Sequence, residues 1–303
     1  MKDYDPIRLE VFKHLFSSVA EEMGMVLRRT GYSPNIKERR DFSCALFDAQ
    51  GRMIAQAAHI PVHLGAMPLS VQACIQAHNF APGDVAILND PYRGGTHLPD
   101  ITAVTPIFSK NRGADRRLIG FAANRAHHSD VGGMSPGSMP LSQELYQEGL
   151  IIPPLKLVAG GQINREIWDL VLANVRTPEE RAGDLRAQMA ANQKGGERLH
   201  ELVTRYGLDE VQGNMRGLLA YAERMTRRLI ASLPDGVYHF SDRMDDDGLN
   251  SEPAEISVAV TIQGDDVVVD FAGTSPQRRG CINAVYAITL SATYYVFRAL
   301  IGL

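Results

Sequence analysis

Two copies of the pattern His-x-x-Asp are the residues of this sequence best suited to chemistry. His97 and Asp100 form the first copy, and His127 and Asp130 form the second. A divalent metal of borderline hardness prefers imidazole nitrogens together with carboxylate oxygens, and a catalytic site leaves one position open for water or substrate. The combination suits Mn, Zn or Fe better than Ca. Either pair alone is more often a solvated histidine beside an aspartate, so a metal site requires that the two pairs meet in space.

The elements around the two patterns predict that they do meet. Residues 101–108 and 118–124 have the composition of β-strands, and the polar, turn-rich residues 109–117 connect them as a hairpin. If the hairpin is symmetric about residues 113 and 114, antiparallel pairing places Asp100 opposite Ala126 or His127. Opposed residues have Cβ atoms about 4.5–5.5 Å apart. The hairpin is therefore expected to gather five side chains at one end: His97, Asp100, His127, His128 and Asp130.

Two residues that precede the hairpin are candidates for the same site. Asp41 ends a run of charged residues that begins at Glu38. It is either a third carboxylate ligand steadied by neighbouring arginines or one partner of a surface ion pair. His63 follows His59 by four residues, but the intervening proline excludes a zinc-binding helix of the HExxH kind. His63 is therefore an acid/base, a support for a metal ligand, or a structural histidine.

Three other segments carry weaker signals. Glu148 lies in an apolar stretch and is either a general acid/base or a cap or ion-pair partner. The glycine-rich residues 92–97 have amides suited to an anion, but the chain lacks the ending of a P-loop and the GxGxxG dinucleotide pattern. Residues 133–137 match GxSxG, yet Pro136 has no N–H for an oxyanion hole, which argues against a serine hydrolase. We instead expect residues 131–138 to form a flexible loop beside the metal.

Composition and charge narrow the class of protein. The 303 residues are 45% hydrophobic with a formal net charge of −4, and the basic residues form no stripe, so nucleic acid is not an expected partner. Cys44, Cys74 and Cys281 form no CxxC pair and are expected to be reduced core residues of a cytoplasmic protein without a signal peptide. The apolar residues 282–303 contain Arg298, which costs about 2.5–3.5 kcal/mol in mid-membrane, so a core helix is favoured over a membrane span.

Hydrophobic periodicity predicts an α+β fold with mixed, largely antiparallel strands and a helical segment after residue 164. The expected strands are 42–47, 52–56, 85–88, 101–108, 118–124, 256–263 and 267–271. The expected helices are 7–27, 68–78, 167–174, 179–193, 208–233 and one within 282–303, and the glycine pair at 195 and 196 is expected to end the fourth. We expect a metal-site domain over 1–233 and, over 234–303, the start of a second, β-containing segment that is incomplete.

Several longer motifs resemble one family. They are SPNIKERRDFS (residues 33–43), HIPVHLGAMP (59–68), NDPYRGGTHLPD (89–100), ANRAHHSDVGG (123–133) and DFAGTSPQ (270–277). Together they resemble the B-type component of the hydantoinase/5-oxoprolinase family (hydantoinase B), which is related to the larger subunits of acetone and acetophenone carboxylases. Typical members of that family are longer, so the chain resembles only the N-terminal part of such a component.

The resemblance implies a heteromeric enzyme in which an A-type subunit binds ATP and activates a carbonyl oxygen. The B-type subunit then opens a cyclic amide such as a hydantoin, 5-oxoproline or a related lactam. The metal of that subunit would lower the pKa of a bound water, which then attacks the activated ring. Carried over to this sequence, the metal ligands are Asp41, His97, Asp100 and His127. The candidate catalytic residues beside them are His63, His128, Asp130 and Glu148.

Two alternatives remain at the level of sequence. The chain is instead part of an ATP-dependent ketone carboxylase, in which the same kind of site orients an enolate toward carbon dioxide or bicarbonate. Otherwise it is a scaffold or binding subunit without turnover. The residues do not decide between Mn, Zn and Fe, because one ligand set serves several metals.

Overall fold

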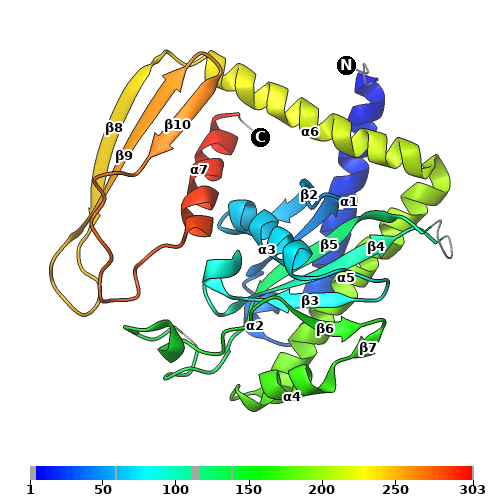
Figure 1. The fold of residues 1–303 in the computed structure, drawn as a ribbon, viewed down its shortest axis with the longest axis horizontal. Coiled ribbons are helices and arrows are strands. Elements are labelled where there is room, and N and C mark those ends of the chain that lie inside the picture. The colour runs from blue at the N-terminus through cyan, green and yellow to red at the C-terminus, as the bar shows by residue number, and fades with distance from the viewer. Residues whose placement is uncertain (1–4, 59, 111–115, 138, 302–303) are drawn as a thin grey trace.

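The computed structural model describes residues 5–58, 60–110, 116–137 and 139–301. Its largest element is a seven-stranded sheet with the strand order β2-β1-β5-β4-β3-β6-β7, in which every described pairing is antiparallel (Figure 1). The prediction of an α+β fold with largely antiparallel strands is confirmed. The strands are β1 (Phe42–Asp48), β2 (Met53–Ala58), β3 (Val85–Leu88), β4 (Asp100–Phe108), β5 (Leu118–His127), β6 (Leu155–Ala159) and β7 (Gln162–Ile163).

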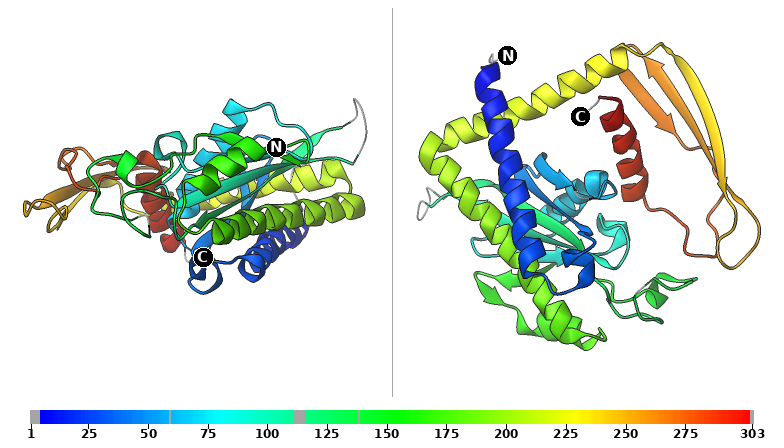
Figure 2. Two further views of the ribbon diagram at one scale, coloured as in Figure 1. Left: turned by 90° about the horizontal axis from the view of Figure 1, so that it is seen from below. Right: turned by 180° about the vertical axis from the view of Figure 1, so that it is seen from behind.

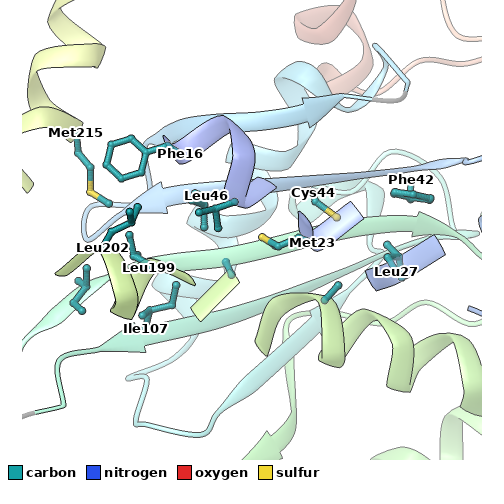
Figure 3. Close-up of a cluster of buried hydrophobic side chains, with 14 of the residues drawn as sticks. Phe16, Met23, Leu27, Phe42, Cys44, Leu46, Ile107, Leu199, Leu202 and Met215 are labelled. Carbon is teal, nitrogen blue, oxygen red and sulfur yellow. The ribbon is translucent and has the colours of Figure 1, made fainter. Parts of the chain in front are cut away.

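Helices cover both faces of this sheet. On one face, α1 (Pro6–Thr30) and α5 (Pro178–Tyr206) enclose a core with β1, β5 and α6 (Leu208–Ala231), shown in Figure 3. On the other face, α3 (His63–Ala77) packs on alternate residues of the same strands, among them Phe47 and Phe121. The period of two along a strand therefore divides its side chains between the two layers. The short α2 (Pro34–Lys37) follows α1, and α4 (Arg165–Ala173) precedes α5.

The first helix follows the predicted pattern. Asp5 caps it, because its carboxylate accepts the amide N–H of Ile7 at 2.9 Å, and Pro6 occupies the first helical position, where its missing N–H costs nothing. The helix buries a stripe at helical spacing that includes Phe12, Phe16 and Met23. The expected helix over 7–27 is thus confirmed and extends by a few residues at its C-terminal end.

The prediction that Gly195 and Gly196 end a helix is wrong. Helix α5 continues through both residues to Tyr206. A Cβ atom built at Gly195 would lie 2.6 Å from the sulfur of Met23 and 3.1 Å from the Cβ of Ala122. The glycine therefore lets α5 approach α1 and β5 closely, and the tertiary packing outweighs the weak helix propensity of the residue.

This packing predicts opposite effects for the two adjacent glycines. Gly195→Leu is expected to lower the free energy of unfolding by about 1–3 kcal/mol, because the added side chain overfills the contact with Met23. Gly196→Ala meets nothing closer than Ile107 at 3.8 Å and is expected to raise that free energy by about 0.5–1 kcal/mol. Urea unfolding followed by circular dichroism measures both. Equal effects of the two substitutions would contradict the assigned role of Gly195.

A second, smaller sheet follows α6. It has the order β10-β9-β8 and consists of β8 (Gly236–Met244), β9 (Ala254–Gln263) and β10 (Asp266–Asp270). The expected strands near 256–263 and 267–271 are present. The strand β8 was not predicted: its side chains are mostly exposed, and Asp242 interrupts the alternation of Tyr238, Phe240 and Met244. That residue 233 separates two domains stays a prediction.

The last helix, α7 (Tyr286–Leu300), returns to the main body beside α3 (Figures 1 and 2). The amide of Gly65 donates to the hydroxyl of Ser291 at 2.9 Å, and a Cβ at Gly65 would lie 2.7 Å from the amide nitrogen of Ser291. The two helices therefore touch backbone to backbone. No helix in the described part of the chain combines the length and apolar character that a membrane span needs.

Candidate metal centre

The β4–β5 hairpin brings the two sequence patterns together. Asp100 pairs directly with His127, as the symmetry of the hairpin predicted. A third segment joins them, because the amide of His127 donates to the carbonyl oxygen of Asp41 at 2.9 Å, just before β1 begins. Asp41, Asp100 and His127 therefore form one row across three adjacent strands, on the face that α3 covers.

The side chains of this row converge with His97. The Nε2 atom of His97 lies 3.0 Å from Oδ1 of Asp100, and Nδ1 of His127 lies 3.3 Å from the same oxygen. The two imidazole rings are 5.0 Å apart between centroids. One ligand atom from each of His97, Asp100 and His127 lies within 4.8 Å of the others. Asp41 is next to them, with Oδ2 3.8 Å from Nδ1 of His127.

His63 completes the cluster from a different element. It is the first residue of α3, which begins five residues before the expected helix 68–78. Its Nε2 lies 3.4 Å from Oδ2 of Asp100, and its Nδ1 is hydrogen-bonded to the hydroxyl of Ser43 at 3.0 Å. Asp41, His63 and Asp100 form a second set of three atoms within 4.8 Å of one another. His59, four residues earlier, lies outside the described residues.

Two buried atoms of the cluster suggest a cation. Oδ1 of Asp100 and Nε2 of His63 are both shielded from solvent, and neither has a hydrogen-bond partner among the described residues. The imidazole nitrogens near Oδ1 are close enough to interact but are not aligned to donate. A buried polar atom without a partner costs about 1–3 kcal/mol. A divalent metal would satisfy Oδ1 of Asp100, and a water or substrate at the same centre would satisfy Nε2 of His63, so the residues fit the group that the sequence predicted.

Burial and neighbouring charges shift the pKa values of the cluster residues in different directions. Burial raises the pKa of Asp41 above its ordinary value. Burial acts on Asp100 in the same direction, but the neighbouring His97, His127 and His63 outweigh it and hold its pKa well below the ordinary value. The pKa of His97 is raised because the attraction of Asp100 exceeds the effect of burial. The three histidines therefore favour the carboxylate form of Asp100.

Two side chains of the cluster are partly exposed to solvent and the others are buried. The side chains of His97 and Asp41 are 38% and 28% exposed, whereas those of His63 and Asp100 are 0% and 3% exposed. A small molecule would reach the cluster past His97 and Asp41. The alternative that Asp41 belongs to a surface ion pair is not supported, because its ion-pair partner within the described residues is His127 rather than Arg39 or Arg40.

The loop that carries His97 is held by its glycines and by Asn89. The side chain of Asn89 bonds to the backbone of Leu98, Leu150 and Ile152. Gly94 has φ 89° and lies so close to α3 that a Cβ would be 2.6 Å from the carbonyl carbon of Leu69. The amide of Gly95 donates to Asp90 within the loop. The glycine-rich run thus serves close packing, and the amide of Gly95 is not free for an anion.

Three candidate catalytic residues are not brought into the cluster. His128 points to the opposite face of the sheet, where its Nε2 bonds to Gln188 of α5 at 2.9 Å and burial lowers its pKa to about 4. Asp130 pairs with Arg176 at 2.7 Å, and Glu148 accepts the hydroxyl of Ser142 at 2.8 Å. The catalytic roles of these three residues stay predictions. The contacts described here give each of the three a structural role.

Two of the three cysteines lie where they were predicted, and the third does not. Cys44 and Cys74 are buried and unpaired, which confirms that they are reduced core residues. Cys281 is exposed, so its assignment to the core is wrong. It follows the small sheet, where its thiol contacts the carbonyl oxygen of Pro140 at 3.4 Å.

The polar residues beneath the cluster had no counterpart among the predictions. Arg125 is fully buried two residues before His127, and Ser70, Thr96 and Thr102 surround its guanidinium. The sequence could have indicated this position of Arg125. Residues two apart on a strand share a face, so Arg125 is expected beside His127.

A cavity of about 1020 Å³ lies elsewhere, between α3, α7 and the small sheet. Its lining includes Leu69, Gln72, Ile256, Arg278 and Tyr286, and the five cluster residues lie outside that lining. We place the candidate site at the cluster and not in this cavity, because the cluster holds the convergent imidazoles, the carboxylates and the unpartnered buried atoms.

Fold and cluster together define an α+β protein with a His/Asp centre at the end of an antiparallel hairpin. Comparison with known sequences identifies the family. Residues 5–303 match the family described as hydantoinase B/oxoprolinase, and the chain belongs to that family.

Two relatives illustrate the similarity. The chain is 41% identical over 317 residues to the 5-oxoprolinase of Saccharomyces cerevisiae, an alignment that covers 99% of this chain and 24% of the relative. It is 37% identical over 289 residues to a putative B-type component of a D-/L-hydantoinase from a Pseudomonas species, covering 91% of this chain and 48% of the relative. The chain thus spans about a quarter of the length of the first relative and about half of the second.

Two solved structures share the fold. An ATP-dependent caprolactamase from Pseudomonas jessenii superimposes with a TM-score of 0.89 at 33% identity, over 97% of this chain and 50% of that one. An acetone carboxylase in its nucleotide-free form gives a TM-score of 0.87 at 20% identity, over 97% of this chain and 41% of that one. The second likeness concerns the fold alone.

Proposed function

We propose that this chain is the metal-dependent part of an ATP-dependent cyclic-amide hydrolase, which opens a hydantoin, 5-oxoproline or a related lactam. Family membership and the names of the relatives support the class of substrate. The observation that carries the proposal is the pair of buried, unpartnered atoms on Asp100 and His63, at the centre of five convergent side chains. Metal ligation is the function that this arrangement supports best.

The roles of the residues follow from their positions. Asp41, His97, Asp100 and His127 would hold a divalent cation, either Mn, Zn or Fe. Bound there, the cation supplies a Lewis acid that polarises a carbonyl oxygen and lowers the pKa of water. His63 is held by Ser43 and faces the cluster from α3, so it is the residue placed to accept or return a proton. The exposed side of His97 and Asp41 admits the substrate.

A partner subunit would supply the activation step. An unactivated lactam carbonyl is a poor electrophile, and the described residues contain neither a P-loop nor a GxGxxG dinucleotide pattern. We therefore infer that ATP binds to an A-type subunit in a hetero-oligomer. The Pseudomonas relative is named as one subunit of a hydantoinase, which supports this arrangement.

Metal analysis tests the proposal directly. The purified chain is expected to retain close to one equivalent of Mn, Zn or Fe after dialysis, measured by inductively coupled plasma mass spectrometry. Treatment with a chelator should remove the metal, and readdition should restore it. A chain that neither retains nor rebinds stoichiometric metal would favour the scaffold alternative.

Reconstitution with an A-type partner separates the two enzymatic alternatives. We expect ATP hydrolysis coupled to ring opening of a cyclic amide, detected by chromatography of the opened product. ATP-dependent incorporation of labelled bicarbonate into a ketone, without ring opening, would instead assign the chain to the carboxylases.

A further inference from the structure

Arg125 is a fully buried arginine without a carboxylate partner. It lies in β5, its side chain has no exposed surface, and no Asp or Glu within the described residues comes within ion-pair distance of it. Burial lowers its pKa to about 10, while the attraction of Asp100 works in the opposite direction. The guanidinium is therefore charged at neutral pH, and the Asp100 carboxylate is the negative group that acts on it.

Strand register places Arg125 directly under the candidate metal centre. Arg125 pairs with Ser43 of β1 and with Thr102 of β4, while the next row on the same face holds Asp41, His127 and Asp100. Residues two apart on a strand share a face of the sheet. Each residue of the Arg125 row therefore lies beside one residue of the cluster.

The guanidinium ties three elements together beneath the cluster. Its Nε donates to the hydroxyl of Thr102 at 2.8 Å, and its Nη2 donates to the hydroxyl of Ser70 in α3 at 2.6 Å. Nη2 also donates to the carbonyl oxygen of Gly94 at 3.1 Å, in the loop that carries His97. One planar group thus links β4, α3 and the His97 loop, which a lysine ammonium cannot do with the same geometry.

A short relay connects Arg125 to Asp100. Nη1 of Arg125 approaches the hydroxyl of Thr96 at 3.5 Å, and that hydroxyl donates to Oδ2 of Asp100 at 2.7 Å. Because Arg125 is only a donor, the Thr96 hydrogen is directed to the carboxylate. The bond engages Oδ2 and leaves Oδ1 facing His97 and His127.

We propose that Arg125 is a positioning residue of the metal centre, which acts through Thr96 on Asp100 and through Gly94 on the His97 loop. The inference rests on the proposed metal function and deepens it. Groups that orient metal ligands typically contribute 10- to 100-fold to metal affinity. Arg125 is expected to contribute in this range without touching the metal or the substrate.

Arg125→Lys tests the inference with Arg181→Lys as its control. Both arginines are buried and both variants keep the charge, but Arg181 lies on α5 and bonds to Asp184 and Glu180, away from the cluster. Titration of the metal-free chain with Mn²⁺ by calorimetry should show a dissociation constant raised about 10- to 100-fold by Arg125→Lys. Arg181→Lys should leave it within about twofold of the wild-type value. Equal weakening by both variants would reduce the role of Arg125 to general stability and overturn the inference.

Thr96→Val provides the second arm and does not depend on the folding of the arginine variant. The substitution keeps the shape of the side chain and removes only the hydroxyl that reaches Asp100, so it should also weaken Mn²⁺ binding. If Arg125 acts through Thr96, the two effects are less than additive in the double variant. Normal Mn²⁺ affinity of Thr96→Val would overturn the relay. A wild-type chain that binds no metal would instead remove the proposed function itself.

Discussion

His97→Ala is expected to lower the affinity of the purified chain for divalent metal by more than about 100-fold, because loss of a ligand exceeds the 10- to 100-fold effect of losing its supports. The imidazole of His97 lies 3.0 Å from Oδ1 of Asp100 and reaches the open side of the cluster. His97 is a better test than Asp100, which is buried and also accepts the Thr96 hydroxyl. Because His97 is 38% exposed, its truncation leaves no closed cavity, and the fold should persist.

Three measurements together decide this prediction. The metal content of the purified variant reports metal ligation, and circular dichroism reports whether the fold persists. Ring opening in the presence of the proposed A-type partner reports activity. His14→Ala is the matched control, since His14 is an exposed histidine of α1 whose partner is Glu10. The control should keep its metal and its activity. If His97→Ala unfolds the chain, or retains metal as the wild type does, His97 is a structural residue and the ligand set is wrong.

Asp184→Ala is expected to lower the free energy of unfolding by about 3–5 kcal/mol, because it removes one of the two carboxylates paired with the buried Arg181 and leaves two backbone amides without their acceptor. Oδ2 of Asp184 accepts Nη2 of Arg181 at 3.0 Å, and both side chains are buried. Oδ1 accepts the amides of Tyr32 and Ser33 at 2.7 and 3.1 Å. These amides belong to the turn that follows α1, so Asp184 also fixes the backbone of that turn.

The pH dependence of this effect has a defined sign. Burial alone would raise the pKa of Asp184, but the attraction of His128 and the amide donors outweigh it and lower the pKa. A lowered carboxyl pKa contributes stability above the ordinary value of about 3.9 and loses it as the pH falls below that value. The difference between wild type and variant in urea unfolding should therefore be full at pH 7 and shrink in acid.

Two further variants isolate the cause. Asp169→Ala removes an exposed aspartate of the neighbouring α4 and should change stability by less than about 0.5 kcal/mol. The double variant Arg181→Met/Asp184→Leu removes both charges and should recover part of the loss, while the amides of Tyr32 and Ser33 remain unpaired. A double variant as unstable as Asp184→Ala would mean that the amides, and not the buried charge, account for the effect.

Contacts between residues that are close in sequence, or that lie symmetrically about one turn, were predictable from the sequence. The pairing of Asp100 with His127 follows from the lengths of two adjacent strands and their link, so a local rule was sufficient. The stripe of α1 and its cap at Asp5 are likewise local. The motifs around Asp41, His97 and His127 also indicated the family without any knowledge of the structure.

Long-range packing decided the rest. Whether α5 stops at Gly195 depends on how closely Met23 and Ala122 approach, and neither is near it in sequence. Strand alternation alone turns His128 away from the face of His127, but its partner Gln188 lies 60 residues later in the chain and was not predictable. Arg125 looked like an ordinary charged residue until Ser70, Thr96 and Thr102 were placed around it.

Local sequence was enough to specify most of the strands, the hairpin register and the kinds of donor atoms available to a metal. Which of these donors meet depends on tertiary packing, because a shared position requires α3 and the loops before β1 and β4 to pack on one face of the sheet. Local backbone preferences contain no information about such contacts, since the free energy that selects them comes from burial and from the pairing of buried polar groups across the whole molecule.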